Sequence, residues 1–345
     1  MKKLLFFLLI LLVIGAAVAA WLFVGPGTGF SDKKEVVYIR TDAANKAAIM
    51  DTLRQNKIVK NETLFNFLAD RMNYWQSIKP GKYEIEKGSS VLEIVRKLRN
   101  GQQTPVNLTI TKVRTKEDLA RLIGRRMEVD SAQMLQYINS NEFLQQKGLD
   151  AEQAMTLVLP DTYTYFWNAT PKAIWEKIVQ ASDKYWTAER KKQAEALGVT
   201  PVQAYIIASI VEEESNKLEE KDTIASVYLN RLRIGMPLQA DPTVKFALKD
   251  FALTRIYGEH LNAASPYNTY RNRGLPPGPI CTPSRKTLDE VLAAPKTDYI
   301  YFVAHPDLNG THSFSSSYAE HQQKARAYQQ AYKEWAAKRS AATNP

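Results

Sequence analysis

The 345-residue sequence has little of what several enzyme classes require. Cys281 is its single cysteine, so no intrachain disulfide is possible and stability must come from core packing. Its few histidines include His305, His312 and His321, which lack the short i, i+4 spacing with Glu that is typical of many metal sites. No Gly-rich phosphate loop or Cys/His finger occurs. We therefore expect no cofactor, no metal ion and no nucleic acid.

Positive charge is in excess, although it is not gathered into long runs of Lys and Arg. The net charge is +10, which suits a neighbour of anionic lipid or of anionic wall polymer. A solvated basic surface explains the same number equally well.

One long apolar run stands at the N-terminus. Leu4–Val24 carries no charge and follows Lys2 and Lys3. A helix of this length would be roughly 30 Å long, the thickness of a bilayer's hydrocarbon core, so a single membrane span is expected. The alternative is a cleaved signal peptide, because Ala17–Ala19 is similar to a cleavage site. The apolar run continues past it through Trp21–Phe23, which favours an anchor with an extracytoplasmic body.

Residues 26–34 are predicted to be a linker, followed by a small unit over residues 35–112. Hydrophobic spacing and turn residues predict strands at Val36–Arg40 and Gly81–Ile85, helices at Ala43–Gln55 and Leu64–Met72, and a further helix closed by Gly101. This is a compact β-α-α-β unit. Its segment Lys82–Val95 resembles the strand, turn and helix of LysM-type glycan-binding modules. The resemblance implies glycan contact, and a role as spacer and support is the alternative.

A larger domain is expected over residues 113–338, with a tail at 339–345. Its first half is helical by composition, with a turn predicted at Leu159–Tyr163 because Pro160 and Asp161 precede aromatic residues. After a helix at Ile224–Met236, Pro237–Thr243 is predicted to be an extended or turning loop, since prolines interrupt helices.

The chemistry is expected at the end of one apolar helix. Thr200, Pro201 and Gln203 form a strong helix start with a capping box. The helix stays apolar until Glu212–Glu214, three carboxylates at an end where the helix dipole disfavours them. Helix geometry places Glu214 above apolar residues, and an apolar site raises a carboxyl pKa so that the group can serve as a general acid. Three solvated charges at a helix end remain the alternative.

Several ordered motifs resemble the endolytic murein transglycosylase family, also called YceG-like. The motifs are Ala208–Ser215, Val227–Val244, Tyr267–Tyr270 and Gly274–Ile280, with Leu159–Tyr163 and His312–Phe314 in support. The resemblance implies an α+β fold, with a single N-terminal transmembrane helix, the LysM-like module and a larger mixed α/β catalytic domain. It also implies that Glu214 is the catalytic acid. The family often has Lys where this chain has Glu213, whose added negative charge should favour protonation of its neighbours.

The resemblance implies a lytic transglycosylase that acts on peptidoglycan strands near the membrane, where cell-wall synthases or division and elongation proteins are potential partners. A single acid would cleave the bond between N-acetylmuramic acid and N-acetylglucosamine and leave a 1,6-anhydro end. Candidates for substrate contact are Glu212, Asn230, Gln239, Asp241, Tyr267, Asn268 and Thr269. Two alternatives stay open: a hydrolytic muramidase, in which Asp241 is the base, and a non-catalytic wall-binding scaffold.

Overall fold

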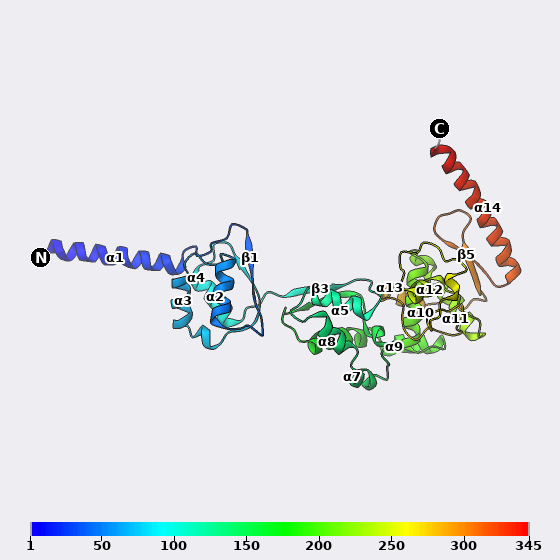
Figure 1. Ribbon diagram of the computed structural model, residues 1–345, viewed down its shortest axis with the longest axis horizontal. Helices are drawn as coiled ribbons and strands as arrows, with labels where there is room; N and C mark the ends of the chain where they lie inside the picture. Colours follow the sequence, from blue (N-terminus) through cyan, green and yellow to red (C-terminus); the bar gives the residue numbers. More distant parts are fainter. Residues whose placement is uncertain (1, 344–345) are drawn as a thin grey trace. The chain divides into compact units, whose positions relative to one another are not determined.

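The computed structural model describes residues 2–343 and divides into two compact units (Figure 1). Unit 1 contains residues up to 108 together with 123–130 and 164–170, and unit 2 contains 109–122, 131–163 and the chain from 171 onward. Met1 of the predicted N-terminal anchor segment and residues 344–345 of the predicted tail lie outside the described residues. Two-stranded sheets are interspersed among many helices, which confirms the expected α+β class.

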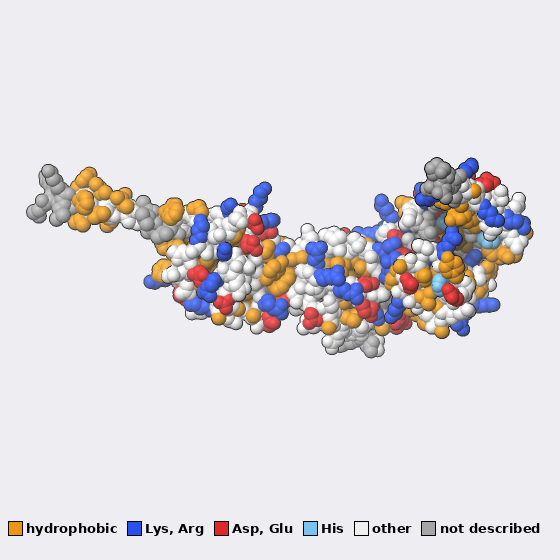
Figure 2. Space-filling view, turned by 45° about the horizontal axis from the view of Figure 1, so that its top comes forward, with side chains coloured by type: hydrophobic (Ala, Val, Ile, Leu, Met, Phe, Trp, Pro, Cys, Tyr) orange, Lys and Arg blue, Asp and Glu red, His pale blue; other side chains and the backbone are white. Residues whose placement is uncertain are grey.

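Unit 1 begins with an apolar helix. Its elements are α1 (Lys2–Val24), β1 (Lys34–Ile39), α2 (Lys46–Gln55), α3 (Glu62–Arg71), the short 3-10 helix η1 (Tyr74–Gln76), β2 (Gly81–Glu86) and α4 (Val91–Asn100). The large apolar side chains from Phe6 to Ile14 are exposed, and Figure 2 shows hydrophobic atoms on the visible face of this part of α1. Among the side chains that the structure describes, no single helix is long and apolar enough to cross a membrane, and the apolar stretch in α1 covers Phe6–Gly15.

The helices after α1 in unit 1 pack around one antiparallel pair of strands. β1 and β2 are antiparallel, with Val37 opposite Tyr83, and both side chains are fully buried against the helices. The α4 helix starts with a reciprocal capping box between Ser90 and Glu93 and ends at Gly101, whose φ of 67° is left-handed. The predicted order of strand, two helices and strand is therefore present.

Two short strands form the second sheet, where one local prediction is wrong. β3 (Val106–Ile110) pairs with β4 (Asp161–Tyr165), although the Pro160–Asp161 pair predicted a turn. In β4 the side chains of Tyr163 and Tyr165 are buried, while those of the alternating residues Thr162 and Thr164 are exposed. This alternation is the period-2 pattern of a strand with one buried face, and it outweighs the turn preference of the preceding residues.

Unit 2 is mainly helical. Its helices are α5 (Lys116–Gly124, which ends in a segment of unit 1), α6 (Ser131–Ile138), α7 (Asn141–Gln146), η2 (Ala154–Leu157), α8 (Pro171–Tyr185), α9 (Ala188–Ala196), α10 (Pro201–Glu214), η3 (Leu218–Glu220), α11 (Lys221–Arg233), α12 (Asp241–Leu248), η4 (His260–Asn262), α13 (Arg285–Leu292) and α14 (Tyr318–Thr343). The antiparallel strands β5 (Tyr301–Ala304) and β6 (His312–Ser315) pack against α14, which runs past β5 in Figure 1.

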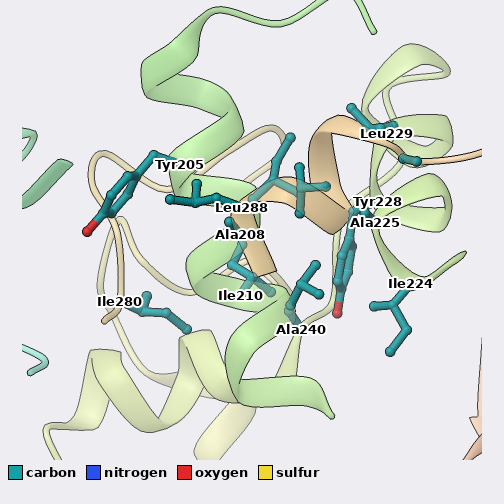
Figure 3. Close-up of a cluster of buried hydrophobic side chains, with 14 of the residues drawn as sticks. Tyr205, Ala208, Ile210, Ile224, Ala225, Tyr228, Leu229, Ala240, Ile280 and Leu288 are labelled. Carbon is teal, nitrogen blue, oxygen red and sulfur yellow. The ribbon is translucent and has the colours of Figure 1, made fainter. Parts of the chain in front are cut away.

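The core of unit 2 surrounds α10. The predicted capping box between Thr200 and Gln203 is confirmed, and residues 204–211 of this helix are all buried. Figure 3 shows Ala208 and Ile210 of α10 beside Tyr228 of α11 and Leu288 of α13. A helix buried on all sides has no freedom to rotate, so the residues at its end are held in fixed directions.

The predicted loop at Pro237–Thr243 is wrong in its second half. α12 begins at Asp241 and holds Pro242 in its first turn. A proline is tolerated there because the first helical N–H groups have no partner within the helix. Pro242 therefore lies at the start of a helix, although a loop was predicted at this position.

Candidate active site

Glu214 is the last residue of α10, and the chain turns to extended backbone at Ser215. Its side chain is half-buried and opens into a cavity of about 460 Å³. The other lining residues are Ala304, His305, Leu308, Gly310, Thr311 and His312 from β5, β6 and their connecting loop, and Tyr328, Tyr332 and Trp335 from α14. One carboxyl group therefore lies in a pocket whose walls carry both aromatic and hydrogen-bonding side chains.

The carboxyl of Glu214 has an elevated pKa with an identifiable cause. Burial raises its pKa to about 7, and the negative charge of Asp241 acts in the same direction. The hydroxyl of Tyr228 donates a hydrogen bond of 2.5 Å to Oε1 of Glu214, which opposes the rise by favouring the carboxylate. Such a group is present in both protonation states near neutral pH, as a general acid and base requires.

Two cations also act on Glu214 from neighbouring elements. The charges of Arg231 on α11 and Lys245 on α12 lower its pKa, against the larger effect of burial. Arg231 is buried, and its guanidinium donates to the backbone oxygens of Ile300 at 2.7 Å and Leu238 at 2.5 Å. These contacts fix the cation, so it is a permanent source of positive potential for the site.

Asp241 accepts a hydrogen bond from Tyr270, a residue that was not among the candidates predicted from the sequence. The hydroxyl of Tyr270 donates to Oδ1 of Asp241 at 2.6 Å. Burial raises the pKa of Tyr270, and the hydrogen bond to Asp241 and the charges of Asp241 and Glu214 raise it further. Tyr270 closes the motif Tyr267–Tyr270. Its position as the last aromatic residue of that motif was the available signal, but the three residues before it were chosen instead.

The other two acids of the Glu212–Glu214 run are paired. Glu213 lies 2.8 Å from Nζ of Lys112 and 3.0 Å from Arg114. Although burial opposes them, these charges leave its pKa below the ordinary value. The expectation that Glu213 favours protonation of its neighbours needs correction, because its charge is neutralised and Asp241 is the acid that raises the pKa of Glu214.

Glu212 is not among the residues that line the cavity. Its Oε2 accepts from Nζ of Lys221 at 2.9 Å, from Ser284 at 3.3 Å and from Thr287. Lys221 and Thr287 are themselves buried. The predicted substrate candidate therefore belongs to an ion pair that ties α10 to α11 and α13.

Three further candidates are buried and hold the backbone around the site. Asn230 donates to the carbonyl oxygens of Thr297 and Tyr299, both at 2.8 Å, and so positions the chain that enters β5. Asn268 donates to Leu261 and Ala263, and Thr269 accepts from the backbone N–H of Ala240 at 3.0 Å. These contacts link the Tyr267–Tyr270 motif to the start of α12.

Two candidates have exposed or half-exposed positions. Gln239 is exposed and has a left-handed φ of 51°, which is uncommon for a residue other than glycine and stores strain next to the site. Tyr267 donates to Glu152 at 2.7 Å and packs against Phe246 with ring centroids 4.6 Å apart. It lines a different cavity of about 240 Å³, together with Arg114 and Lys116.

The late histidines do not all lie at one site. His305 and His312 line the cavity of Glu214, and Nδ1 of His312 lies 3.0 Å from Oε1 of Glu220. His321 stacks on Tyr301 with centroids 5.1 Å apart. In the described part of the chain, no three His, Cys, Asp or Glu side chains are grouped so that they could hold a metal ion.

The model of the YceG-like family matches residues 37–327. This chain belongs to the YceG-like family. The matched stretch contains Glu214, Tyr228, Arg231, Asp241 and the whole β5–β6 hairpin, whereas the aromatic residues of α14 that line the cavity lie just beyond it.

Named relatives of this YceG-like chain share one activity. It is 28% identical over 319 residues to the endolytic murein transglycosylase of Bacillus subtilis, covering 86% of each chain. It is also 28% identical over 308 residues to that of Streptococcus pneumoniae strain D39, covering 79% of this chain and 55% of the relative, so it spans about half of the pneumococcal protein. A crystal structure of a putative YceG-like protein from Listeria monocytogenes has a TM-score of 0.57 at 28% identity and covers 85% of this chain and 99% of that one.

Proposed function

We propose that this protein is an endolytic lytic transglycosylase that cleaves the β-1,4 bond between N-acetylmuramic acid and N-acetylglucosamine in peptidoglycan. The membership in the YceG-like family and the two relatives named as endolytic murein transglycosylases support the activity. The observation that carries the residue assignment is Glu214, a carboxyl with a pKa of about 7 at the wall of a 460 Å³ cavity.

In the proposed reaction Glu214 acts first as acid and then as base. Its proton passes to the glycosidic oxygen as the bond to C1 breaks. The 6-hydroxyl of the muramic sugar then attacks C1 and returns its proton to Glu214, which leaves a 1,6-anhydro ring and consumes no water. The attacking group belongs to the substrate and is already close to C1, so an enzymic nucleophile is unnecessary.

The neighbours of Glu214 support both halves of that cycle. When Glu214 has lost its proton, the O–H of Tyr228 and the charge of Arg231 stabilise the carboxylate. When it is protonated, burial and Asp241 keep it so. We assign direct substrate contact to Gln239 and Asp241, whose side chains are exposed, and to Tyr267, which lines the second cavity. A positioning role is assigned to Glu212, Asn230, Asn268 and Thr269.

A hydrolytic muramidase is the second candidate, because a second carboxylate acts on Glu214. The charge of Asp241 raises the pKa of Glu214, and an acid with a second carboxylate nearby is the pair that ordinary glycosidases use. In that reaction Asp241 activates a water molecule, and the product has a reducing end.

The products distinguish the two reactions. Full-length protein in detergent is incubated with uncrosslinked glycan strands, and the fragments are weighed by mass spectrometry. A muramic end lighter by one water mass supports the transglycosylase, and a reducing end supports the muramidase. We expect Glu214→Gln to reduce cleavage roughly 100-fold to 10,000-fold. Full activity in Glu214→Gln with none in Asp241→Asn would overturn the residue assignment.

We propose one role for the N-terminal helix and another for the small unit that follows it. Residues 4–24 anchor the protein in the cell membrane with its body outside the cytoplasm, a role supported by the exposed apolar side chains of α1. The LysM-like unit at 35–112 contacts glycan. Membrane fractionation together with the intact mass of the mature chain tests the anchor, because a cleaved signal peptide would shorten the chain. Retention of residues 26–112 on purified peptidoglycan tests the glycan contact.

A further inference from the structure

The wall of the active-site cavity that α14 contributes is aromatic. Tyr328, Tyr332 and Trp335 line the same cavity as Glu214. They stand four and three residues apart, a spacing that places them on one face of a helix. Successive ring centroids are 6.1 Å and 5.7 Å apart, with interplanar angles of 37° and 33°. The three rings thus form one continuous row along α14, which we call the aromatic row.

Core packing does not account for the aromatic row. None of its side chains is buried, and Trp335 is 43% exposed. The neighbouring positions of α14, such as Gln329, Lys333 and Glu334, are polar and exposed, as expected for a surface helix. Large aromatic side chains held open beside a cavity are typical of binding sites, where their area is covered only when a ligand is present.

The central ring of the row is held in place. Nη2 of Arg255 donates to the hydroxyl of Tyr332 at 2.9 Å, and the same guanidinium lies 5.6 Å from the centre of its ring. α14 packs against β5 and β6, and the loop between these strands and the start of β6 bring His305, Thr311 and His312 into the same cavity. A ligand in this cavity therefore meets both aromatic rings and hydrogen-bonding groups.

We propose that the aromatic row is a stacking platform for the sugar rings of the glycan strand next to the bond that Glu214 cleaves. A pyranose has a face of C–H bonds and a rim of hydroxyls. The C–H face is attracted to the negative face of an aromatic ring, and the rim hydroxyls bond to polar neighbours. The cavity offers both, and the series of rings along one helix suits a linear polymer better than a single sugar. This inference rests on the proposed function and adds a site for the extended strand.

The experiment separates strand binding from cleavage. In full-length protein that carries Glu214→Gln, the affinity for uncrosslinked glycan strands is measured with and without Trp335→Ala and Tyr328→Ala. We expect each change to raise Kd roughly fivefold to tenfold for long strands, because stacking of an aromatic ring contributes about 1 kcal/mol. Trp335→Phe should retain most of the affinity. Gln329→Ala, a change at an exposed position of the same helix outside the cavity lining, should change nothing.

Kinetics with an otherwise native chain test the role further, because a purely structural defect would not change KM for long strands alone. Trp335→Ala should raise KM for long strands with little change in kcat, and should have no effect on the shortest fragment that is cleaved. Active enzyme with unchanged KM and Kd in both alanine variants would overturn the platform and leave the proposed function intact. Strand binding that depends on Trp335 in a chain that cleaves nothing would support the platform and reject the proposed function.

Discussion

The phenolic hydroxyl of Tyr228 donates a 2.5 Å hydrogen bond to Oε1 of Glu214. Tyr228 belongs at the same time to the buried core between α10 and α11, so the core itself holds the partner of the proposed catalytic acid (Figure 3). The bond favours the ionised carboxyl, and burial favours the protonated one. The pKa of about 7 is the balance of these effects.

Removal of that hydrogen bond should extend activity to higher pH. The acid must be protonated in the free enzyme, so kcat/KM falls as pH rises through about 7. In Tyr228→Phe the carboxylate loses a stabilising bond and its pKa rises, by about one unit if the bond contributes 1.5 kcal/mol. The alkaline limb of the pH profile should therefore move upward. A limb that stays in place would show that another group controls it.

Asp241→Asn should move the same limb in the opposite direction. The charge of Asp241 raises the pKa of Glu214, so its removal lowers that pKa and activity declines at lower pH than in the native protein. The comparison uses kcat/KM from pH 5 to 9. Tyr270→Phe is the matched control, since it removes the hydrogen bond to Asp241 and keeps the charge. Identical profiles for Asp241→Asn and native protein would contradict the electrostatic link.

Glu214→Gln should stabilise the fold at alkaline pH. The folded pKa of about 7 lies above the ordinary value of 4.5, so the unfolded state releases its proton first. Native stability attributable to this group is therefore lost as pH rises from about 4.5 to 7. The amide does not titrate, so the melting temperature of the variant relative to native should increase over that window, by roughly 2–4 °C for each kcal/mol of stability that the native protein loses. Equal differences at pH 4 and pH 8 would refute this origin of the pKa shift.

Glu212→Ala should destabilise the protein. It leaves Lys221, whose side chain is only 7% exposed, without its anionic partner. Removal of one member of a buried ion pair costs about 3–5 kcal/mol. Urea unfolding measures the loss, and Glu219→Ala, which removes an exposed acid on η3, serves as the control. A stable, fully folded but inactive Glu212→Ala would instead assign Glu212 to substrate.

Gly278→Ala should be costly for a steric reason. An added Cβ would overlap the backbone carbonyl of Glu152 and approach Oη of Tyr267 to 2.9 Å. Overpacking of this kind destabilises by about 1–3 kcal/mol. The matched control is Gly258→Ala, where a Cβ meets nothing within 4 Å. Thermal unfolding should separate the two variants. Equal melting temperatures would mean that the backbone at Glu152 moves aside without a cost in stability.

Local patterns predicted local structure well. The capping box at Thr200 and the stop at Gly101 depend on neighbours within a few residues, and both are present. The start of α12 was not predicted from the sequence. A proline interrupts a helix when a helical turn precedes it and is tolerated when it lies in the first turn, as Pro242 does. That choice is made by contacts with the distant Thr269.

The site was predictable only in part, because its chemistry depends on partners distant in sequence. Helix phasing alone favoured Glu214 over its two neighbours narrowly, and the family motif made the choice firm. That Glu212 meets Lys221 and Thr287, and Glu213 meets Lys112, follows from tertiary packing alone. The polar residues Asn268 and Thr269 looked like sugar ligands, yet they satisfy backbone groups, which is the commonest task of buried side chains of this kind.

The position of Glu214 at the carboxyl end of α10 has a consequence for the transition state. Helix dipoles give that end a partial negative charge, which disfavours an anion but favours a cation. Cleavage of a glycosidic bond develops positive charge at C1 and the ring oxygen. The end of α10 would thus act as a fixed electrostatic partner for the sugar cation. A sugar analogue with a protonated ring nitrogen should consequently bind more tightly than its neutral counterpart, and more so as the carboxyl ionises.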